Sequence, residues 1–218
     1  MSQNENLIWN FFKDKGLSDC GIAGLMGNLQ AESGLKPTNL QNSSERKLGM
    51  TDSEYTNAVD NGTYTKFSSD SAGYGLAQWT WWTRKRNLYN YAKKAKKSIG
   101  DLEMQLEFLY EELSKDYKSV LKVLLNAKTV LEASNAVLFN YEAPADQGTS
   151  VQVKRARYAQ KFYDKYAAVG TFTLTKDCYT FWSVSLKFGC TVAEIQKLNP
   201  TLSPYKLKIG QVINVPAK

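Results

Sequence analysis

The sequence predicts an α+β protein: a mainly α, two-lobed domain at residues 1–168, followed by a small βααβ domain at residues 171–218. Three observations predict this fold class. Apolar side chains recur at three- and four-residue spacings through most of the first 168 residues, as in amphipathic helices. A stretch rich in Ser, Thr, Asn and Asp interrupts that pattern between residues 36 and 72. After Gly170 one strand-like, two helical and one strand-like segment follow, and 218 residues leave room for one medium and one small domain.

Two helices are predicted at the N-terminus. The first covers residues 7–12, and its apolar face is expected to pack in the core. The second begins near Ser18 or Asp19, either of which can cap it, and apolar residues then recur at i, i+3, i+4 and i+7. Glu32 falls on this apolar face, and Gly34 ends the helix just beyond it. The carboxyl group of Glu32 is therefore expected at a helix C-terminus among apolar neighbours.

That position gives Glu32 a chemical interpretation. Desolvation and the negative end of the helix both favour the protonated carboxyl, so its pKa is expected to be raised. A carboxyl that stays protonated near neutral pH is what a general acid for glycoside cleavage requires. The alternative is a helix-end Glu that only turns into solvent, which is the commoner case for a lone Glu.

The polar stretch that follows predicts a second lobe. Thr51 and Glu54 form a capping-box pattern that starts a short helix, closed by Asn61-Gly62. Residues 63–67 alternate like a short strand. A polar, partly β insertion after a helix ending in Glu is one way to build a two-lobed cleft. A long surface loop explains the same composition equally well.

Residues 73–79 read Gly-Tyr-Gly-Leu-Ala-Gln-Trp, and Thr80, Trp81, Trp82 and Arg84 come next. The glycines let the backbone turn sharply or approach a ligand. Aromatic faces stack on sugar rings, while amide and guanidinium groups bond their hydroxyls, so this density of Trp suits sugar recognition. The alternative is that these tryptophans pack in the core, and at least one of the three is expected to do so.

The rest of the chain predicts four helices and then the small domain. The helices cover residues 102–113, 120–125, 130–139 and 151–166, and the small domain has strands at 171–174 and 211–215 and helices at 181–188 and 192–198.

The composition excludes several function classes. The chain has no histidine, so zinc hydrolases and Cys or Ser nucleophiles that need a His base are close to excluded. Carboxylates remain for acid and base work, and paired carboxylates are the apparatus of glycosidases. Cys20, Cys178 and Cys190 have no metal-site spacing, and three free thiols are expected. We expect no cofactor and no metal.

Charge and hydropathy indicate where the protein acts. A net charge of +7 favours a polyanionic environment, and anionic cell-wall polymers are the partner expected, with nucleic acid a distant alternative. The chain has no run of 18 apolar residues and no signal-peptide pattern, so membrane insertion is not expected. We expect a monomer made in the cytoplasm, which reaches the bacterial cell wall after lysis or as part of a phage particle.

Residues 26–28 (Met-Gly-Asn), 31–33 (Ala-Glu-Ser) and 73–80 resemble the phage tail lysozyme family of the lysozyme-like superfamily. Gln105, Phe108-Leu109, residues 141–144 (Tyr-Glu-Ala-Pro), Arg157 and Tyr158 resemble later blocks of that family, and the likeness covers roughly residues 5–168. The resemblance implies that Glu32 is the general acid cleaving the β-1,4 bond between N-acetylmuramic acid and N-acetylglucosamine. It also implies a cleft lined by the substrate-binding residues Gly75, Leu76, Gln78, Trp79, Thr80 and Tyr141, with Gly75-Leu76 contributing backbone and Tyr141 near Glu32.

The second catalytic carboxylate is left open. Goose-type lysozymes, which belong to the same superfamily, carry an Asp just after the Gly-Leu-x-Gln-x segment, where this chain has Thr80. Asp70 is the first candidate and Glu45 the second. An inverting enzyme needs its two carboxyl groups about 6.5 to 9.5 Å apart with water between them. Without such a pair, a route that needs no water attack is favoured.

The last 48 residues resemble a LysM domain, through Trp182-Ser183-Val184, Phe188-Gly189, Ile195 to Pro200 and Leu207 to Pro216. The resemblance implies binding of N-acetylglucosamine-containing glycans through two loops, Tyr179-Thr180 and Asn199, Pro200, Thr201 and Leu202. Cys178-Tyr179 stands where the common Gly-Asp occurs.

The two parts together predict a peptidoglycan hydrolase, an endolysin or tail-associated lysozyme of muramidase type, whose partner is the glycan strand of peptidoglycan. A catalytic part and a wall-binding part on one chain both point to the cell wall. Tethering by the binding part raises the effective substrate concentration for the catalytic part. The alternatives are a lytic transglycosylase with the same bond specificity and a non-catalytic glycan-binding tail protein.

Overall fold

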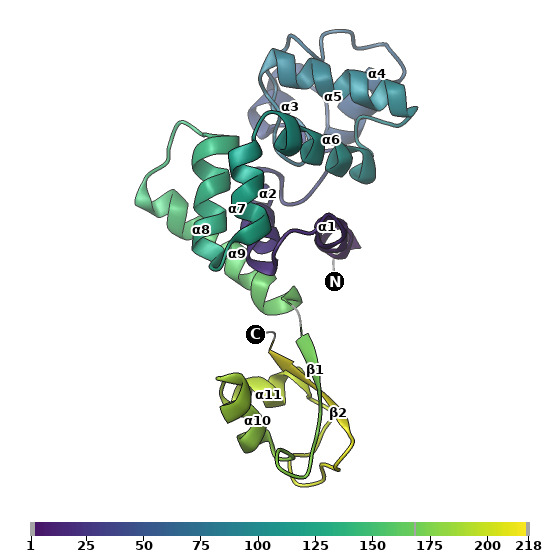
Figure 1. Ribbon diagram of the computed structural model, residues 1–218. Helices are drawn as coiled ribbons and strands as arrows, with labels where there is room; N and C mark the ends of the chain where they lie inside the picture. Colours follow the sequence, from purple (N-terminus) through teal and green to yellow (C-terminus); the bar gives the residue numbers. More distant parts are fainter. Residues whose placement is uncertain (1–2, 168, 217–218) are drawn as a thin grey trace. The chain divides into compact units, whose positions relative to one another are not determined.

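The structure is a computed structural model that describes residues 3–167 and 169–216 (Figure 1). The chain divides into two compact units, Met1–Lys165 and Tyr166–Lys218. Ala168, where the sequence analysis ends the first domain, lies outside the described residues, as do residues 217 and 218 of the second.

The regular elements in the described part of the first unit are all helices. Its elements are α1 (Gln3–Asp14), α2 (Asp19–Ser33), α3 (Asn42–Leu48), α4 (Asp52–Asp60), α5 (Trp82–Ala95), α6 (Leu102–Lys115), α7 (Lys118–Asn126), α8 (Val130–Val137), the π-helix η1 (Leu138–Glu142) and α9 (Thr149–Tyr166). Figure 1 shows α3, α4 and α5 gathered at one end of this unit and α7, α8 and α9 at the other. Helix α6 packs against α5, α1 and α7. The predicted two-lobed arrangement therefore has a polar lobe, α3 to α5 with residues 61–81, and a helical lobe.

Helix α2 lies at the centre of the helical lobe, packed against α1, α7 and α8. Ser18 caps it by accepting a hydrogen bond from the backbone N–H of Gly21, and Gly34 ends it in the left-handed conformation at φ +63°, as predicted. Gly21 to Leu29 are buried on every side, so α2 is a core helix rather than an amphipathic one. A Cβ at Gly24 would lie 2.5 Å from the Cβ of Ala133, so only glycine lets α8 approach this closely.

The polar lobe contains less β structure than the sequence predicts. The capping box at Thr51 is present and starts α4, as expected. Residues 63–67, predicted as a strand, form no strand in the structure. Their alternation has another cause: Phe67 is buried and makes edge contact with Tyr74, while Thr63, Thr65 and Lys66 are exposed.

The Gly-Leu-x-Gln segment, residues 75–78, forms a tight turn. Tyr74 and Trp79 exchange backbone hydrogen bonds of 3.2 and 3.0 Å, and the four residues between them form the turn. Gly75 has φ +77° and Gln78 has φ +45°, which is left-handed backbone that a strand does not contain. Helices α3 and α5 were not predicted, and α5 follows this turn directly.

The second unit is the predicted βααβ fold. Strands β1 (Val169–Thr173) and β2 (Val212–Pro216) pair antiparallel, with Phe172 opposite Ile213. Helices α10 (Phe181–Phe188) and α11 (Val192–Leu198) have the predicted bounds. Its core consists of Leu174, Phe181, Val184, Ile195, Ile213 and Val215. Cys178 and Cys190 are free thiols packed at the edge of this core, and Cys20 in the first unit is also free.

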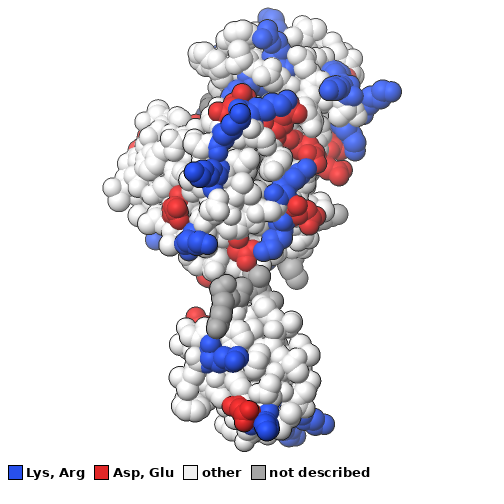
Figure 2. All heavy atoms as spheres, in the orientation of Figure 1, with Lys and Arg blue, Asp and Glu red and all other residues white. Residues whose placement is uncertain are grey.

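The surface charge is mixed rather than concentrated. On the face of the first unit that Figure 2 shows, Lys and Arg are interspersed with Asp and Glu. None of the described helices is long and apolar enough to cross a membrane.

Candidate active site

Glu32 lies in the last turn of α2, and its carboxyl group forms an ion pair with Arg155 of α9. The Nη2 of Arg155 donates to Oε1 of Glu32 at 2.5 Å, and the side chains are 8% and 19% exposed, respectively. Glu32 is thus reachable from solvent while its partner is almost enclosed. The guanidinium is a counter-charge to Glu32 that the sequence analysis did not include.

Two neighbours on α2 hold Arg155 in place. A Cβ at Gly27 would lie 2.6 Å from the Cβ of Ala159 and 2.7 Å from the backbone oxygen of Arg155, so the glycine lets α9 lie directly against α2. Asn28 is fully buried, and its Oδ1 accepts from the Nη1 of Arg155 at 3.1 Å. The Nδ2 of Asn28 donates to the backbone oxygens of Gly24 and Ser134 at 2.9 and 3.0 Å. The Met-Gly-Asn motif therefore orients the arginine that contacts Glu32.

A second buried carboxylate, Glu112 of α6, ties the polar lobe to η1. Arg84 binds it through two hydrogen bonds of 2.8 and 2.9 Å, and the Nε1 of Trp79 and the hydroxyl of Tyr141 donate to its Oε2 at 2.8 Å each. The guanidinium of Arg84 also lies 4.6 Å from the ring centroid of Tyr141. Burial works against the charged guanidinium, but Tyr141 and Glu112 raise the pKa of Arg84. We call these four residues the Glu112 network.

Glu142 follows Tyr141 and brings a further carboxyl group into this region. Its Oε1 is buried and has no hydrogen-bond partner among the described residues. Burial, and after it the negative charge of Glu32, raise the pKa of the Glu142 carboxyl well above its usual range. Arg84 and Arg155 oppose this shift, and Glu112 adds to it.

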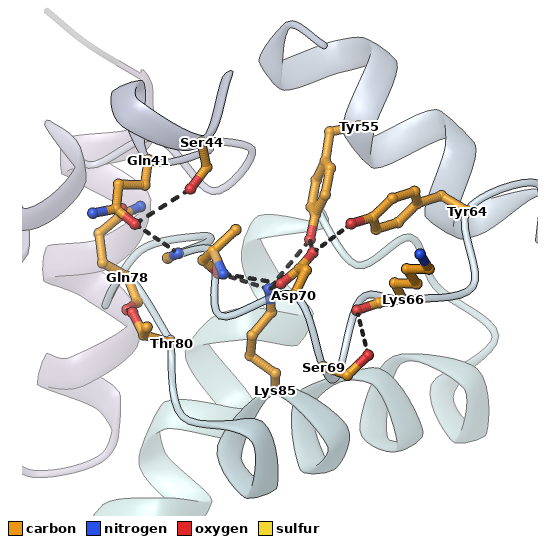
Figure 3. Close-up of polar contacts among 12 residues, drawn as sticks. Gln41, Ser44, Tyr55, Tyr64, Lys66, Ser69, Asp70, Gln78, Thr80 and Lys85 are labelled. Carbon is orange, nitrogen blue, oxygen red and sulfur yellow. Dashed lines mark hydrogen bonds and ion pairs between the residues drawn. The ribbon is translucent and has the colours of Figure 1, made fainter. Parts of the chain in front are cut away.

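Asp70, the first candidate for a second catalytic carboxylate, is instead the centre of a buried polar cluster in the polar lobe (Figure 3). Its Oδ1 accepts from the Nζ of Lys85 at 2.5 Å and from the backbone N–H of Ala72 at 2.9 Å. Its Oδ2 accepts from the hydroxyls of Tyr55 and Tyr64 at 2.5 and 3.1 Å. The side chain is 5% exposed and that of Lys85 is fully buried. Both oxygens of Asp70 are therefore engaged by protein donors, which favours a structural role, and its role as a second catalytic carboxylate stays a prediction.

Comparison with known families identifies the two domains of the chain. The model of the phage tail lysozyme family matches residues 3–166, and the model of the LysM domain matches residues 179–216. The chain belongs to the phage tail lysozyme family. The predicted combination of a mainly helical lysozyme-like domain with a C-terminal LysM domain is thereby confirmed. The protein is a lysozyme-like, peptidoglycan-degrading enzyme of the cell wall, and its LysM domain binds peptidoglycan or chitin-like glycans.

Four expected cleft residues of the phage tail lysozyme domain are buried, Gly75 among them. Trp79 and Leu76 are fully buried, and Tyr141 is 2% exposed with its hydroxyl on Glu112 rather than Glu32. The backbone of Leu76 is also occupied, because its N–H donates to Gln105 and its oxygen accepts from Ser33. The structure shows these residues as part of the packing around the turn, which no single segment of sequence reveals, and their contact with substrate stays a prediction.

Gln78 and Thr80 lie closer to the surface than Gly75, which is buried in the turn. The N–H of Gly75 donates to the Asn39 oxygen, and the Nε2 of Gln78 donates to Asn39 and to the Gly75 oxygen. Thr80 is exposed, with its Oγ1 donating to the Gln78 oxygen at 2.8 Å. Figure 3 shows Gln78 and Thr80 on the side of the loop that faces Gln41. Trp81 and Trp82 are 66% and 50% exposed, so they are the tryptophans available for stacking.

Glu45, the second carboxylate candidate, is partly exposed on α3. It borders a pocket of about 270 Å³ that Arg46, Met50 and Glu54 also line. No contact between Glu45 and Glu32 is formed in the described structure, and Glu45 stays a prediction.

In the LysM domain the predicted glycan-binding residues divide into two groups. Tyr179 is 49% exposed, and Pro200 and Thr201 are exposed as well. Thr180 caps α10, and Leu202 packs against the domain core. Asn199 is 5% exposed and bonds the Ile195 oxygen and both backbone groups of Asn214. Asn199 thus fixes the loop, and its contact with glycan stays a prediction.

Sequence reasoning missed the groups that surround Glu32. Arg155 is separated from Glu32 by 123 positions, and Glu112 lies on a helix that was predicted only as packing. Glu142 lies inside the block that carries the family resemblance but was not singled out. A charged residue interrupting an otherwise apolar helix face, as Glu112 does, is the signal that could have found one of them.

Proposed function

We propose that the lysozyme domain cleaves the β-1,4 bond between N-acetylmuramic acid and N-acetylglucosamine, with Glu32 as the general acid. The observation that carries the proposal is the partly exposed Glu32 carboxyl at the junction of the two lobes, fixed by the almost enclosed Arg155. Ser33, the next residue, donates to the Leu76 oxygen at 2.8 Å and so ties the end of α2 to the turn of the polar lobe. A substrate bound across this junction would meet one oriented carboxyl group.

Arg155 has a chemical role in this proposal. A general acid becomes a carboxylate as it gives its proton to the leaving glycosidic oxygen. A fixed guanidinium beside it stabilises that negative charge as it develops, without any rearrangement of the site. Asn28, which holds the other nitrogen of the guanidinium, keeps the pair oriented.

The fate of the cleaved sugar depends on what attacks it. Both oxygens of Asp70 already accept hydrogen bonds, so we favour Glu45 as the base that activates water. If no base acts there, the muramoyl hydroxyl attacks instead and the enzyme is a lytic transglycosylase. Mass spectrometry of the released muropeptides separates the two routes, because an anhydro product is one water lighter than a hydrolysis product.

The LysM domain is proposed to hold the enzyme on the wall, with Tyr179, Pro200 and Thr201 among its exposed glycan contacts. The net charge of +7 adds unspecific attraction to anionic wall polymers. Raising salt from 0.1 M to 1 M shortens the Debye length from about 10 to about 3 Å, so it weakens this charge term while glycan recognition persists.

The deciding experiment replaces Glu32 by Gln. The isostere cannot donate a proton, so Glu32→Gln is expected to bind walls normally and to lose most clearing activity in a turbidity assay. The matched control is Glu103→Gln, an exposed residue on α6. General acid catalysis is typically worth about 10² to 10⁴-fold, so retention of more than about a tenth of the rate would refute the assignment.

The competing function is a non-catalytic glycan-binding tail protein. Such a protein would pull down purified walls without lowering their turbidity at any enzyme concentration. Clearing by the wild type together with its loss in Glu32→Gln excludes that alternative.

A further inference from the structure

A pocket of about 450 Å³ lies in the lysozyme domain, between the second half of α5 and the second half of α6. Its α5 side consists of Asn87, Asn90, Tyr91 and Lys94. Residues three and four positions apart are neighbours on a helix, so these four side chains share one face of α5. Sites for small molecules have volumes of about 300 to 1,000 Å³, and this pocket falls in that range.

Two aromatic rings form one wall of this pocket. Tyr91 of α5 and Phe108 of α6 have ring centroids 5.7 Å apart, with their planes inclined at 57°. Phe108 is buried and packs against Trp79 with a centroid distance of 5.4 Å, so the wall is fixed to the core of the domain. Tyr91 is partly exposed. A fixed aromatic surface that is partly open to solvent suits stacking against the apolar face of a sugar ring.

The polar groups beside the rings are free to bind a ligand. Asn87 and Asn90 are exposed, and their side-chain amides form no hydrogen bond within the described part of the chain. Each amide supplies two donors and one acceptor oxygen. The hydroxyl and acetamido groups of an N-acetylated sugar also both donate and accept. The pocket therefore combines a stacking surface with unbonded groups of the kind that such a sugar requires.

The charges around the pocket cancel. Lys115 and Glu111 pair with each other at 2.7 Å, and Glu112 is paired inside the Glu112 network. Lys94 and Asp116 also border the pocket, and neither forms an ion pair with another described residue. These two side chains carry opposite charges, so the lining as a whole is neutral. Complementarity therefore favours an uncharged ligand over a phosphate polymer or a nucleic acid.

We propose that this pocket binds an uncharged N-acetylated sugar of the wall glycan, of the N-acetylglucosamine type. It gives the lysozyme domain a glycan-binding site of its own, lined by other residues than Asn28 and Arg155, which hold Glu32. The choice of a wall glycan follows from membership of the phage tail lysozyme family and does not depend on the proposed role of Glu32. A glycan strand held here as well as by the LysM domain is bound at two points, which raises its effective concentration at the enzyme.

The test is a titration of the isotopically labelled full chain with N,N′-diacetylchitobiose, followed in amide NMR spectra. This disaccharide of N-acetylglucosamine contains no N-acetylmuramic acid, so the bond proposed for cleavage is absent and the result does not depend on Glu32. The side-chain amide signals of Asn87 and Asn90, assigned by their loss in Asn87→Asp and Asn90→Asp, are expected to shift and to saturate with one Kd. The backbone signal of Tyr179 reports binding to the LysM domain separately.

A double variant, Asn87→Ala with Asn90→Ala, removes both amides from the pocket. The Kd reported by the backbone signal of Tyr91 is expected to rise about tenfold or more, while the Kd reported by Tyr179 stays unchanged. The matched control is Asn57→Ala, at an exposed asparagine of α4 whose side chain forms no hydrogen bond with the described residues, and it should change neither Kd. Alanine favours helix, so the variants are expected to fold. If the double variant does not fold, the wild-type titration decides.

Three outcomes would overturn the inference. One is saturation of the Tyr179 signal without any shift at Asn87 and Asn90. Another is equal affinity for maltose, which lacks the acetamido groups and should bind the pocket about tenfold or more weakly. The third is tighter binding of inorganic phosphate than of the disaccharide, which would identify an anion site. Clearing of walls by Glu32→Gln would refute the proposed function and leave this inference standing.

Discussion

Replacing Asp70 by Asn tests whether this carboxylate is structural, as its contacts indicate. The substitution keeps the shape of the side chain but removes the negative charge beside Lys85, whose Nζ is buried. Burial lowers the pKa of Lys85 and its hydrogen bond to Asp70 opposes that shift, so the carboxylate is what keeps this lysine charged. Breaking a buried ion pair by removing one partner costs roughly 3 to 5 kcal/mol. In a unit of this size 1 kcal/mol shifts the melting temperature by about 2 to 4 °C, so a drop of roughly 6 to 20 °C is expected.

The measurement is thermal unfolding by circular dichroism, with wall clearing measured well below the lowered transition. Clearing per folded molecule should remain close to wild type. The double variant Asp70→Asn with Lys85→Met should be more stable than Asp70→Asn alone, because it leaves no unpaired charge in the cluster. An Asp70→Asn protein that melts within about 2 °C of wild type but no longer clears walls would show that Asp70 belongs to the catalytic machinery.

Three further outcomes are expected. Gly27→Ala should lower the free energy of unfolding of the lysozyme domain by about 1 to 3 kcal/mol or more in denaturant, because the new Cβ would lie 2.6 Å from Ala159 of α9. The control Gly148→Ala, at an exposed glycine, should change that free energy little. In the LysM domain, Asn199→Ala should lower the free energy of unfolding by about 1 to 3 kcal/mol, because it removes buried hydrogen bonds. Tyr179→Ala should weaken wall pull-down and leave the free energy of unfolding unchanged. A Tyr179→Ala variant that is destabilised, or an Asn199→Ala variant of unchanged stability that no longer binds walls, would contradict our assignment. Truncation after Ala168 should slow wall clearing most at low enzyme concentration and leave cleavage of a short soluble glycan unaffected. Loss of both activities would contradict the independence of the two domains.

Much of the fold could be predicted because its signals are local. The ends of α2, the capping box of α4 and the bounds of α10 and α11 follow from residues a few positions apart, and all are present in the structure. The strand predicted at residues 63–67 is absent from the structure, although its sequence signal is also local. A two-residue alternation is a local signal, but a strand exists only with a partner, and the partner is not local.

The sequence by itself indicated a cell-wall lytic enzyme and predicted Glu32 as its acid. The absence of histidine left carboxylates as the working groups, and Glu32 at a helix end before a glycine was recognisable without any structure. Only the tertiary structure decided which other charges act with it. Nothing in the neighbouring sequence distinguishes Asp70 from Glu142. In the structure Asp70 accepts four hydrogen bonds, whereas Glu142 has a buried oxygen without a hydrogen-bond partner among the described residues. The physical reason is that the energy of a charge depends on the groups within a few ångströms of it, and here those groups come from helices up to 123 residues apart along the chain.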